Sequence, residues 1–337
     1  MVALTAGAAG GLVFFYLHLP LPWMLGSMFA CGSCAVAGLS VTMPMAARLP
    51  MTAVIGSMLG SAFTIEVVGQ LGAWPVPLAG VLLYVCVAGS LSYIYFNRIG
   101  RLDRPTAFFA GMPGGVVEMV TLGAERGGDE RMISLVHGAR IFLVVMSTPF
   151  LIEWLSGASI ARGFAGWVPL SSITMSDTLW FAFSVGLGIA VGSALRLPAP
   201  YLLGPMIISA CFHVSALTEF QLPSVVIAVA QIVLGSNLGC RFAGVPAAKI
   251  AQVFALSIGA TLAMLTLSVV FALSIANLTD LEPAALVLAL SPGGLPEMSL
   301  IALSLNVSVV FVVVHHLARV LLVVSGSGAV FAAVQKG

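Results

Sequence analysis

The sequence predicts an all-helical integral membrane protein built from two inverted repeats, each with five transmembrane helices and one re-entrant helical hairpin. Three observations lead to this fold class. Of the 337 residues, 60% are hydrophobic and only 7% are charged, whereas about a quarter of the residues of a soluble domain are charged. Several motifs recur at an offset of 178 or 179 residues. The lysines and arginines are distributed as expected if the two halves face opposite sides of a membrane.

The first recurring motif predicts a broken helix in each half. The segment Pro113–Met119 reads PGGVVEM, and it returns as PGGLPEM over Pro292–Met298. Proline lacks a backbone donor and glycine adopts dihedral angles that other residues avoid, so each copy stops one helix and starts another. In a bilayer, unpaired backbone groups are tolerated only inside protein or along a water-filled cavity. Each break is therefore expected to line a site, with positive helix N-termini that favour an anion.

A structural alternative applies to each break, in which the chain merely kinks. Glu118 and Glu297 stand at the third position of the restarting helices, where a glutamate can cap the helix. The same glutamates are also expected to be functional, because an ionisable group at membrane depth is energetically costly.

The second recurring motif is His-x-x-Arg, present as His137 with Arg140 and as His316 with Arg319. Residues three apart lie on one face of a helix. Arginine stays charged at any depth and must find a partner. That partner is either an anionic substrate or the glutamate of the same half, which would make two ion pairs that lock each repeat. The histidines titrate near neutral pH and are candidates for coupling a proton.

Together these motifs define the predicted substrate-binding residues. The glycines are expected to meet near the middle of the membrane, with the glutamates close behind the breaks. The set consists of Gly114, Gly115, Glu118, His137, Arg140, Gly293, Gly294, Glu297, His316 and Arg319.

Hydrophobic runs bounded by proline and glycine predict the remaining elements. In the first half we expect full helices over about 2–17, 22–38, 50–68, 76–96 and 132–152. Pro-rich turns at Leu19–Gly26 and Leu197–Gly204 start the second helix of each half. In the second half we expect full helices over about 178–195, 200–217, 223–242, 247–275 and 307–324. The sequence is thus divided into a first repeat, residues 1–152, a linker, 153–177, and a second repeat, 178–337.

The third helices carry small residues four apart, Gly56–Gly60 in the first half and Gly235–Gly239 in the second. Such spacing lets two helices approach closely, and packing is the expected role.

The broken elements, 105–122 and 282–303, have arms of about eight residues, too short to span a membrane singly. Both arms together form either one broken span or one re-entrant hairpin.

Positive charges favour the hairpin, because lysine and arginine accumulate in cytoplasmic loops. With hairpins and a cytoplasmic N-terminus, ten of the eleven lysines and arginines outside the helices are cytoplasmic, and only Arg162 is outside. With spanning elements, the division is six against five. Each half then has five full helices, an odd number, so the second half is inserted upside down. Paired helix breaks in inverted repeats are typical of secondary transporters.

The repeated motifs Leu-Pro-x-Pro-aromatic-x-Leu-Gly, Pro-Gly-Gly-x-x-Glu-Met and His-x-x-Arg resemble those of the bacterial membrane AbrB family, which has an internal duplication. The resemblance extends over almost the whole chain. It implies a multi-pass protein of the bacterial inner membrane, and it brings two functional labels: regulator of gene expression and ammonia monooxygenase.

The residues themselves favour a transporter of a small anion or carboxylate, coupled to a proton or sodium gradient and with both termini cytoplasmic. The alternative is a membrane-bound regulator that affects gene expression indirectly. An enzyme is not expected, because no residue cluster suggests a metal or cofactor site, and we predict no cofactor. The expected partners are the lipid bilayer, the substrate and the coupling ion, with homo-oligomerisation left open. Direct nucleic-acid binding is not expected, because the net charge is only +1.

The five cysteines, which include the pair Cys31 and Cys34, are expected to be packing residues.

Overall fold

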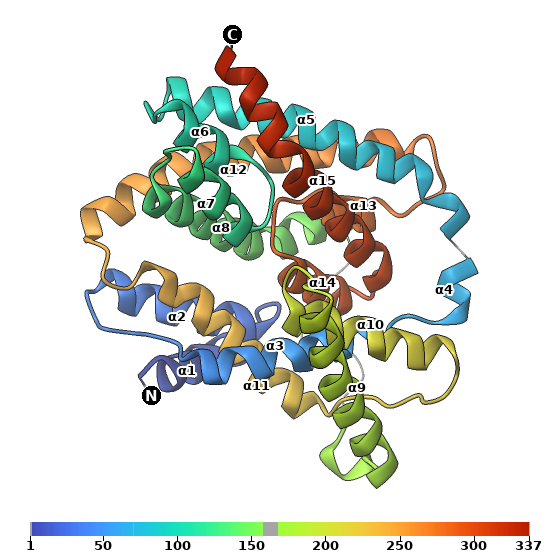
Figure 1. Cartoon of the computed structure of the whole chain (residues 1–337). Coiled ribbons are helices and arrows are strands. Elements are labelled where there is room, and N and C mark those ends of the chain that lie inside the picture. The colour runs from blue at the N-terminus through green and yellow to red at the C-terminus, as the bar shows by residue number, and fades with distance from the viewer. Residues whose placement is uncertain (1, 70, 158–167, 337) are drawn as a thin grey trace. The chain divides into compact units, whose positions relative to one another are not determined.

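The computed structural model describes residues 2–69, 71–157 and 168–336, and within these residues the chain is helical with no strand (Figure 1). The first half contains α1 (Val2–Tyr16), α2 (Pro22–Val36), α3 (Met45–Gly60), α4 (Ile65–Gly69), α5 (Pro75–Arg98), α6 (Arg104–Gly111), α7 (Val116–Glu125) and α8 (Glu130–Ser156). The second half contains α9 (Met175–Ala194), α10 (Pro200–Val214), α11 (Ser224–Gly239), α12 (Ala247–Ala276), α13 (Pro283–Leu290), α14 (Leu295–Ser304) and α15 (Val309–Lys336). Short 3-10 turns stand at Leu71–Ala73, Leu170–Ser172 and Cys240–Phe242.

Six of these segments are long and apolar enough to cross a membrane, so the chain is a membrane protein. They are Pro75–Arg98, Glu130–Leu155, Met175–Ala194, Ser224–Phe242, Ala247–Ala276 and Val309–Ala333. Other helices are apolar but shorter, among them α1, α2 and α10 with 15 residues each. The expectation of ten full spans therefore stays a prediction.

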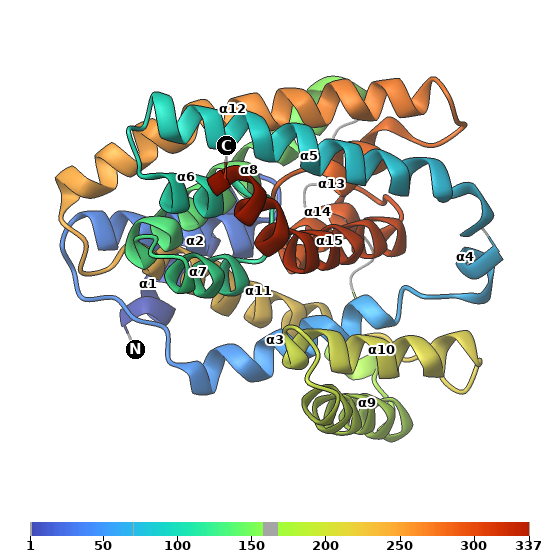
Figure 2. The same ribbon diagram turned by 45° about the horizontal axis from the view of Figure 1, so that its top comes forward.

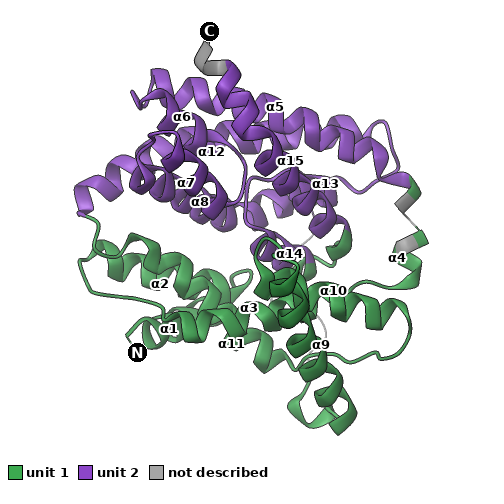
Figure 3. Ribbon diagram, viewed as in Figure 1, with its two compact units in different colours: residues 1–72, 159–245, 303–310 green, residues 73–158, 246–302, 311–337 purple. Residues whose placement is uncertain are grey.

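The described residues form two compact units, and each unit takes helices from both halves of the sequence (Figure 3). Unit 1 comprises residues 1–72, 159–245 and 303–310, which include α1 to α4 and α9 to α11. Unit 2 comprises residues 73–158, 246–302 and 311–337, which include α5 to α8, α12, α13 and most of α14 and α15. The predicted repeats are sequence repeats, and the compact units cut across them. All four motif copies, the two Pro-Gly-Gly breaks and the two His-x-x-Arg pairs, lie in unit 2.

Inside unit 1, corresponding glycines bring the two halves into backbone contact. In α3, a Cβ on Gly56 would lie 2.3 Å from the carbonyl oxygen of Leu202 in α10. In α11, a Cβ on Gly235 would lie 2.3 Å from the carbonyl oxygen of Met24 in α2. Only glycine leaves room for such an approach, which confirms the packing role expected for these small residues. The second helix of each half thus packs on the third helix of the other half.

Inside unit 2, α6 and α7 form a hairpin. The amide of Asp129, just beyond α7, donates to Oγ1 of Thr106 at the start of α6, with an N–O distance of 2.8 Å. Near the end of α7, Gly123 faces Phe109 of α6. The chain therefore returns to where the broken element began, as the hairpin interpretation requires. Both arms contact α8, while the long helices α5 and α12 lie side by side (Figure 2).

The boundaries of the third and the last helix differ most from the sequence-based prediction. The third helix was expected over 50–68, but α3 begins at Met45, continues through Pro50 and ends at Gly60, and a separate short helix, α4, follows at Ile65–Gly69. Pro50 is the sixth residue of α3, so it removes one backbone hydrogen bond, to the carbonyl of Ala46, and the helix continues in spite of this loss. The last helix was expected to end at Val324, but α15 runs to Lys336 through the segment Ser325–Gly328. The predicted linker falls partly on residues 158–167, which include Arg162 and lie outside the described residues.

Candidate functional site

The two breaks adopt one geometry. In the first, α6 ends at Gly111, Met112 turns to an extended conformation with ψ 134°, and α7 restarts after Gly115. In the second, α13 ends at Leu290, Ser291 turns to ψ 137°, and α14 restarts at Leu295. The positions of both breaks were predicted from the sequence.

The reason for the glycines differs from the one expected. Positive φ angles occur at Gly38, Gly127, Gly157 and Gly244 among the described glycines, and not at the four glycines of the breaks. Instead, a side chain at any of these four glycines would meet a neighbouring side chain, which would have to move. A Cβ on Gly115 would lie 2.0 Å from Oε2 of Glu118, and a Cβ on Gly294 would lie 2.1 Å from Oε2 of Glu297. Each glutamate therefore folds back over the last glycine of its own break.

The histidine of each His-x-x-Arg motif replaces a hydrogen bond that the proline removes. In a continuous helix the carbonyl of Phe109 would accept from the N–H of residue 113, but Pro113 has none. Nε2 of His137 lies 2.9 Å from this carbonyl oxygen. In the second break Pro292 leaves the carbonyl of Leu288 without its helical donor, and Nε2 of His316 lies 2.9 Å from it.

The arginine of each motif binds the next exposed carbonyl. Nη1 of Arg140 donates to the carbonyl oxygen of Met112 at 3.0 Å, and Nη1 of Arg319 donates to that of Ser291. Both carbonyls cap the C-terminus of a short helix, where the helix dipole is negative and favours a cation. The two halves thus repeat the same acceptors at the same sequence offset.

These contacts fix the tautomer of both histidines. Nη2 of Arg140 lies 2.9 Å from Nδ1 of His137, and Nη2 of Arg319 lies 3.1 Å from Nδ1 of His316. A guanidinium can only donate, so Nδ1 accepts and carries no proton. Nε2 then carries the proton that is donated to the carbonyl. Protonation of Nδ1 would direct an N–H against the guanidinium and break the histidine–arginine contact.

The alternative of two glutamate–arginine locks is not what the structure contains. Among the described residues, the hydrogen bonds of Arg140 and Arg319 go to backbone carbonyls and to the histidine of the same helix. The physical reason is geometric, because each glutamate folds over its glycine at the start of the second arm, while each arginine binds the end of the first arm.

The two arginines belong to one buried cluster in unit 2. The side chains of Arg140 and Arg319 are 4% and 3% exposed, and their charges are close enough to interact. Tyr84, which is fully buried, lies near both guanidinium groups. Its hydroxyl accepts from Oγ of Ser268 at 3.1 Å. Sequence reasoning missed Tyr84 and Ser268, because neither belongs to a repeated motif.

The cluster is positively charged, and no carboxylate in the described part of the chain hydrogen-bonds to either arginine. In each arginine Nε is buried and has no hydrogen-bond partner among the described residues. A buried donor without an acceptor costs about 1–3 kcal/mol, and burying like charges together adds to that cost. The cluster is therefore suited to accept an anion.

The family assignment agrees with the repeated motifs. The family model described as "Transition state regulatory protein AbrB" matches residues 23–335. The chain belongs to the AbrB family.

Two relatives show how far this AbrB-family chain has diverged. It is 27% identical over 232 residues to "Putative regulator AbrB" of Escherichia coli (strain K12), covering 68% of this chain and 66% of that protein, just under two thirds of its length. It is 26% identical over 289 residues to "Uncharacterized protein YhjN" of Bacillus subtilis (strain 168), covering 77% of this chain and 74% of that protein.

His315, the neighbour of His316, has separate surroundings. Its Nδ1 donates to the carbonyl oxygen of Phe311 at 2.7 Å, and its ring packs on Phe311 and Trp74. His315 is thus a packed histidine with one hydrogen-bonded ring nitrogen. Across the described parts of the chain, no group of three or more histidine, cysteine, aspartate or glutamate side chains is arranged to hold a metal ion.

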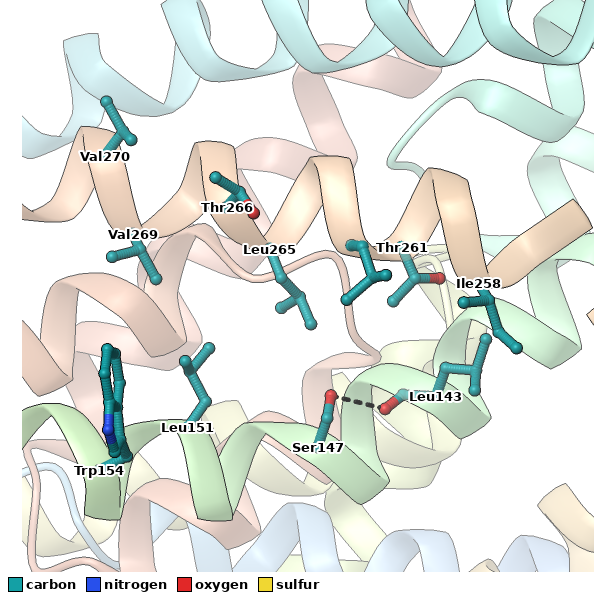
Figure 4. A pocket seen from close by; sticks show the side chains of 11 residues that line it. Leu143, Ser147, Leu151, Trp154, Ile258, Thr261, Leu265, Thr266, Val269 and Val270 are labelled. Carbon is teal, nitrogen blue, oxygen red and sulfur yellow. Dashed lines mark hydrogen bonds between the residues drawn. The ribbon is translucent and has the colours of Figure 1, made fainter. Parts of the chain in front are cut away.

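An apolar groove of about 430 Å³ lies between α8 and α12 in unit 2 (Figure 4). Leu143, Leu151 and Trp154 from α8 line one side, and Ile258 and Leu265 from α12 line the other. None of the predicted site residues lines this groove, so the groove is separate from the arginine cluster.

Proposed function

We propose that this AbrB-family protein is a secondary transporter of a small anion, such as a carboxylate. The observation that carries the proposal is the pair of buried arginines, one from each half, without a carboxylate partner. An anion bound between them would neutralise charge that is costly at membrane depth. It would also provide acceptors for the two Nε groups.

The helix breaks support a transport role. Each one exposes backbone carbonyls inside a membrane helix and uses His137 or His316, together with Arg140 or Arg319, to satisfy them. These contacts come from side chains and can be exchanged, unlike the hydrogen bonds of a continuous helix. Broken helices of this kind form substrate sites in secondary transporters. The hairpin geometry of α6 and α7 also supports inverted repeats. The distribution of lysine and arginine is the ground for placing both termini in the cytoplasm, and membership of the AbrB family is the ground for placing the protein in the bacterial inner membrane.

The histidines provide a route for coupling. Protonation of His137 or His316 at Nδ1 would break its contact with Arg140 or Arg319 and free Nη2 for an anion. Proton uptake and anion binding would then favour each other. We therefore propose a proton as the coupling ion, with sodium as the alternative.

The regulator label in the family description fits this proposal if the effect on gene expression follows from the transported solute. The transporter and regulator proposals differ in one observable property, which is solute movement by the isolated protein.

The test is uptake by the purified protein in liposomes, using radiolabelled small carboxylates with an imposed proton or sodium gradient. The expected result is gradient-driven uptake that Arg140→Lys and Arg319→Lys each reduce by at least tenfold. Lysine keeps the charge but loses the planar donor geometry.

Arg131→Lys is the matched control, because Arg131 is an exposed arginine in the first turn of α8, and it should transport normally. Uptake is compared for samples that elute as folded protein in size-exclusion chromatography. Folded arginine variants that transport as well as the Arg131 control would exclude the arginines from the anion site. Solute uptake that is absent under every gradient would favour the regulator.

A further inference from the structure

The Cys-x-x-Cys segment of α2 has a third cysteine beside it in unit 1. Cys31 is fully buried, and its thiol donates to the carbonyl oxygen of Ala3 at 3.2 Å. Oγ of Ser236 in α11 donates to the same carbonyl oxygen at 3.4 Å. Cys240 follows one turn after Ser236, at the end of α11.

The helices are in backbone contact at this point. A Cβ on Gly239 would lie 2.8 Å from Cβ of Cys31, 2.5 Å from the carbonyl oxygen of Met28 and 2.7 Å from the amide nitrogen of Gly32. Cys240 is the next residue, and it stands one turn after Ser236, whose Oγ shares the carbonyl oxygen of Ala3 with the thiol of Cys31. A disulfide needs two Cβ atoms about 3.5–4.5 Å apart with thiols that face each other. The close approach of Gly239 to Cys31 brings the neighbouring Cys240 to the same contact between α2 and α11.

The related contact in the other half of the chain contains serines. There, a Cβ on Gly60 would lie 2.6 Å from Cβ of Ser209 and 2.3 Å from the carbonyl oxygen of Met206. Ser209 corresponds to Cys31, and Ser61, which follows Gly60, corresponds to Cys240. Packing at this contact therefore does not require sulfur, since the chain builds it once with cysteines and once with serines.

We propose that Cys31 and Cys240 are a modification site, at which a peroxide forms a disulfide that joins α2 to the end of α11. Cys240 is partly exposed and is followed by exposed Arg241, so a small water-borne oxidant has access to this end of the helix.

The chemistry balances with hydrogen peroxide as oxidant. One of the two thiols loses its proton, its thiolate attacks one peroxide oxygen and the O–O bond breaks, so that a sulfenic acid and a hydroxide form; the hydroxide takes up the released proton and becomes water. The other thiol then attacks the sulfenic sulfur, and a second water leaves as the S–S bond forms. Two sulfur atoms lose one electron each, and the peroxide oxygens gain both.

The test uses the full-length protein in detergent, treated with hydrogen peroxide and then blocked with an alkylating reagent. Peptide mapping by mass spectrometry should identify a peptide pair joined through Cys31 and Cys240, which a thiol reductant separates. Cys31→Ser and Cys240→Ser should each abolish it. Cys86→Ser and Cys211→Ser, at exposed cysteines, should leave it unchanged.

The corresponding contact between α3 and α10, which contains Ser61 and Ser209, allows a second test. In a chain with Cys31→Ser and Cys240→Ser, adding Ser61→Cys and Ser209→Cys should restore a peroxide-dependent crosslink between α3 and α10. Oxidation of the unmodified chain that leaves Cys31 and Cys240 as free thiols, or that joins Cys240 to Cys34, would overturn the proposal. This readout does not depend on transport.

Discussion

Arg319 donates to the carbonyl oxygen of Gly293 through Nη2 at 2.8 Å, and this hydrogen bond distinguishes the second break from the first. The residue that corresponds to Gly293 is Gly114, and Arg140 does not donate to it. The two breaks thus share their histidine and capping-carbonyl contacts but differ by one charge-assisted bond.

This difference predicts unequal losses of stability. Arg319→Lys should lower the free energy of unfolding more than Arg140→Lys, because a lysine ammonium cannot bridge acceptors that the guanidinium reaches from two nitrogens. The excess should be about 1.5–3 kcal/mol, the contribution of one hydrogen bond to a charged group. Unfolding of the detergent-solubilised variants by denaturant measures it. Equal losses, or a larger loss for Arg140→Lys, would contradict the asymmetry.

The role of His137 predicts a coupling with Pro113. His137→Phe leaves the carbonyl of Phe109 without a donor and should destabilise the protein by about 1–3 kcal/mol. Pro113→Ala restores an N–H four residues after Phe109, so the same histidine substitution should cost less in that background. A double-mutant cycle on unfolding free energies gives the coupling.

The control for this cycle is Pro292→Ala, the equivalent change in the other break. Pro292→Ala should not reduce the loss of unfolding free energy that His137→Phe causes. Additivity of Pro113→Ala and His137→Phe would show that the histidine does not replace the missing backbone donor.

The crowding at Gly115 predicts a rescue by shortening Glu118. In Gly115→Ala the new Cβ would lie 2.0 Å from Oε2 of Glu118, so the glutamate must leave its position and the melting temperature should fall. Glu118→Ala removes the conflict, and the double variant should melt like Glu118→Ala alone. Gly114→Ala is the comparison, because its Cβ would meet Cγ1 of Val323 at 2.7 Å. Glu118→Ala should not rescue that variant.

Inverted repeats predict opposite membrane sides for corresponding loops. Single cysteines at Arg101 and at Asp280, in a chain without native cysteines, should react with a membrane-impermeant maleimide from the cytoplasmic and the external side, respectively. Labelling of both from one side would show that the halves are parallel.

The sequence predicted the breaks well because proline and glycine act locally. Pro113 and Pro292 end their helices where expected, and the His-x-x-Arg spacing places both side chains on the face that contacts the break. The carbonyl acceptors could have been deduced as well, since Phe109 and Leu288 stand four residues before a proline. What could not be deduced was the preference of each arginine for a helix C-terminus over a glutamate, because this depends on how α8 and α15 pack on the broken elements.

Tertiary packing also explains the other differences. The segment Ser325–Gly328 contains two glycines and two serines, which are weak helix formers, yet α15 continues through it. Beyond this segment, the ring of Phe331 packs on the rings of Phe108 and Phe109 in α6, with centroids 5.1 Å apart, so α15 is held by contacts outside its own sequence. The small residues in α3 and α11 predicted close packing, but no local signal identified the partner helix in the opposite half.

The exchange of partners in unit 1 has a consequence for how the protein is made. At a synthesis rate of roughly 5–20 residues per second, α3 emerges from the ribosome roughly ten seconds before α10, whose carbonyl oxygen at Leu202 occupies the space beside Gly56. During that interval α3 lies in the bilayer without its packing partner, and the space beside Gly56 is not filled by α10. The N-terminal half expressed alone should therefore be degraded, and simultaneous expression of the C-terminal half as a separate chain should protect it.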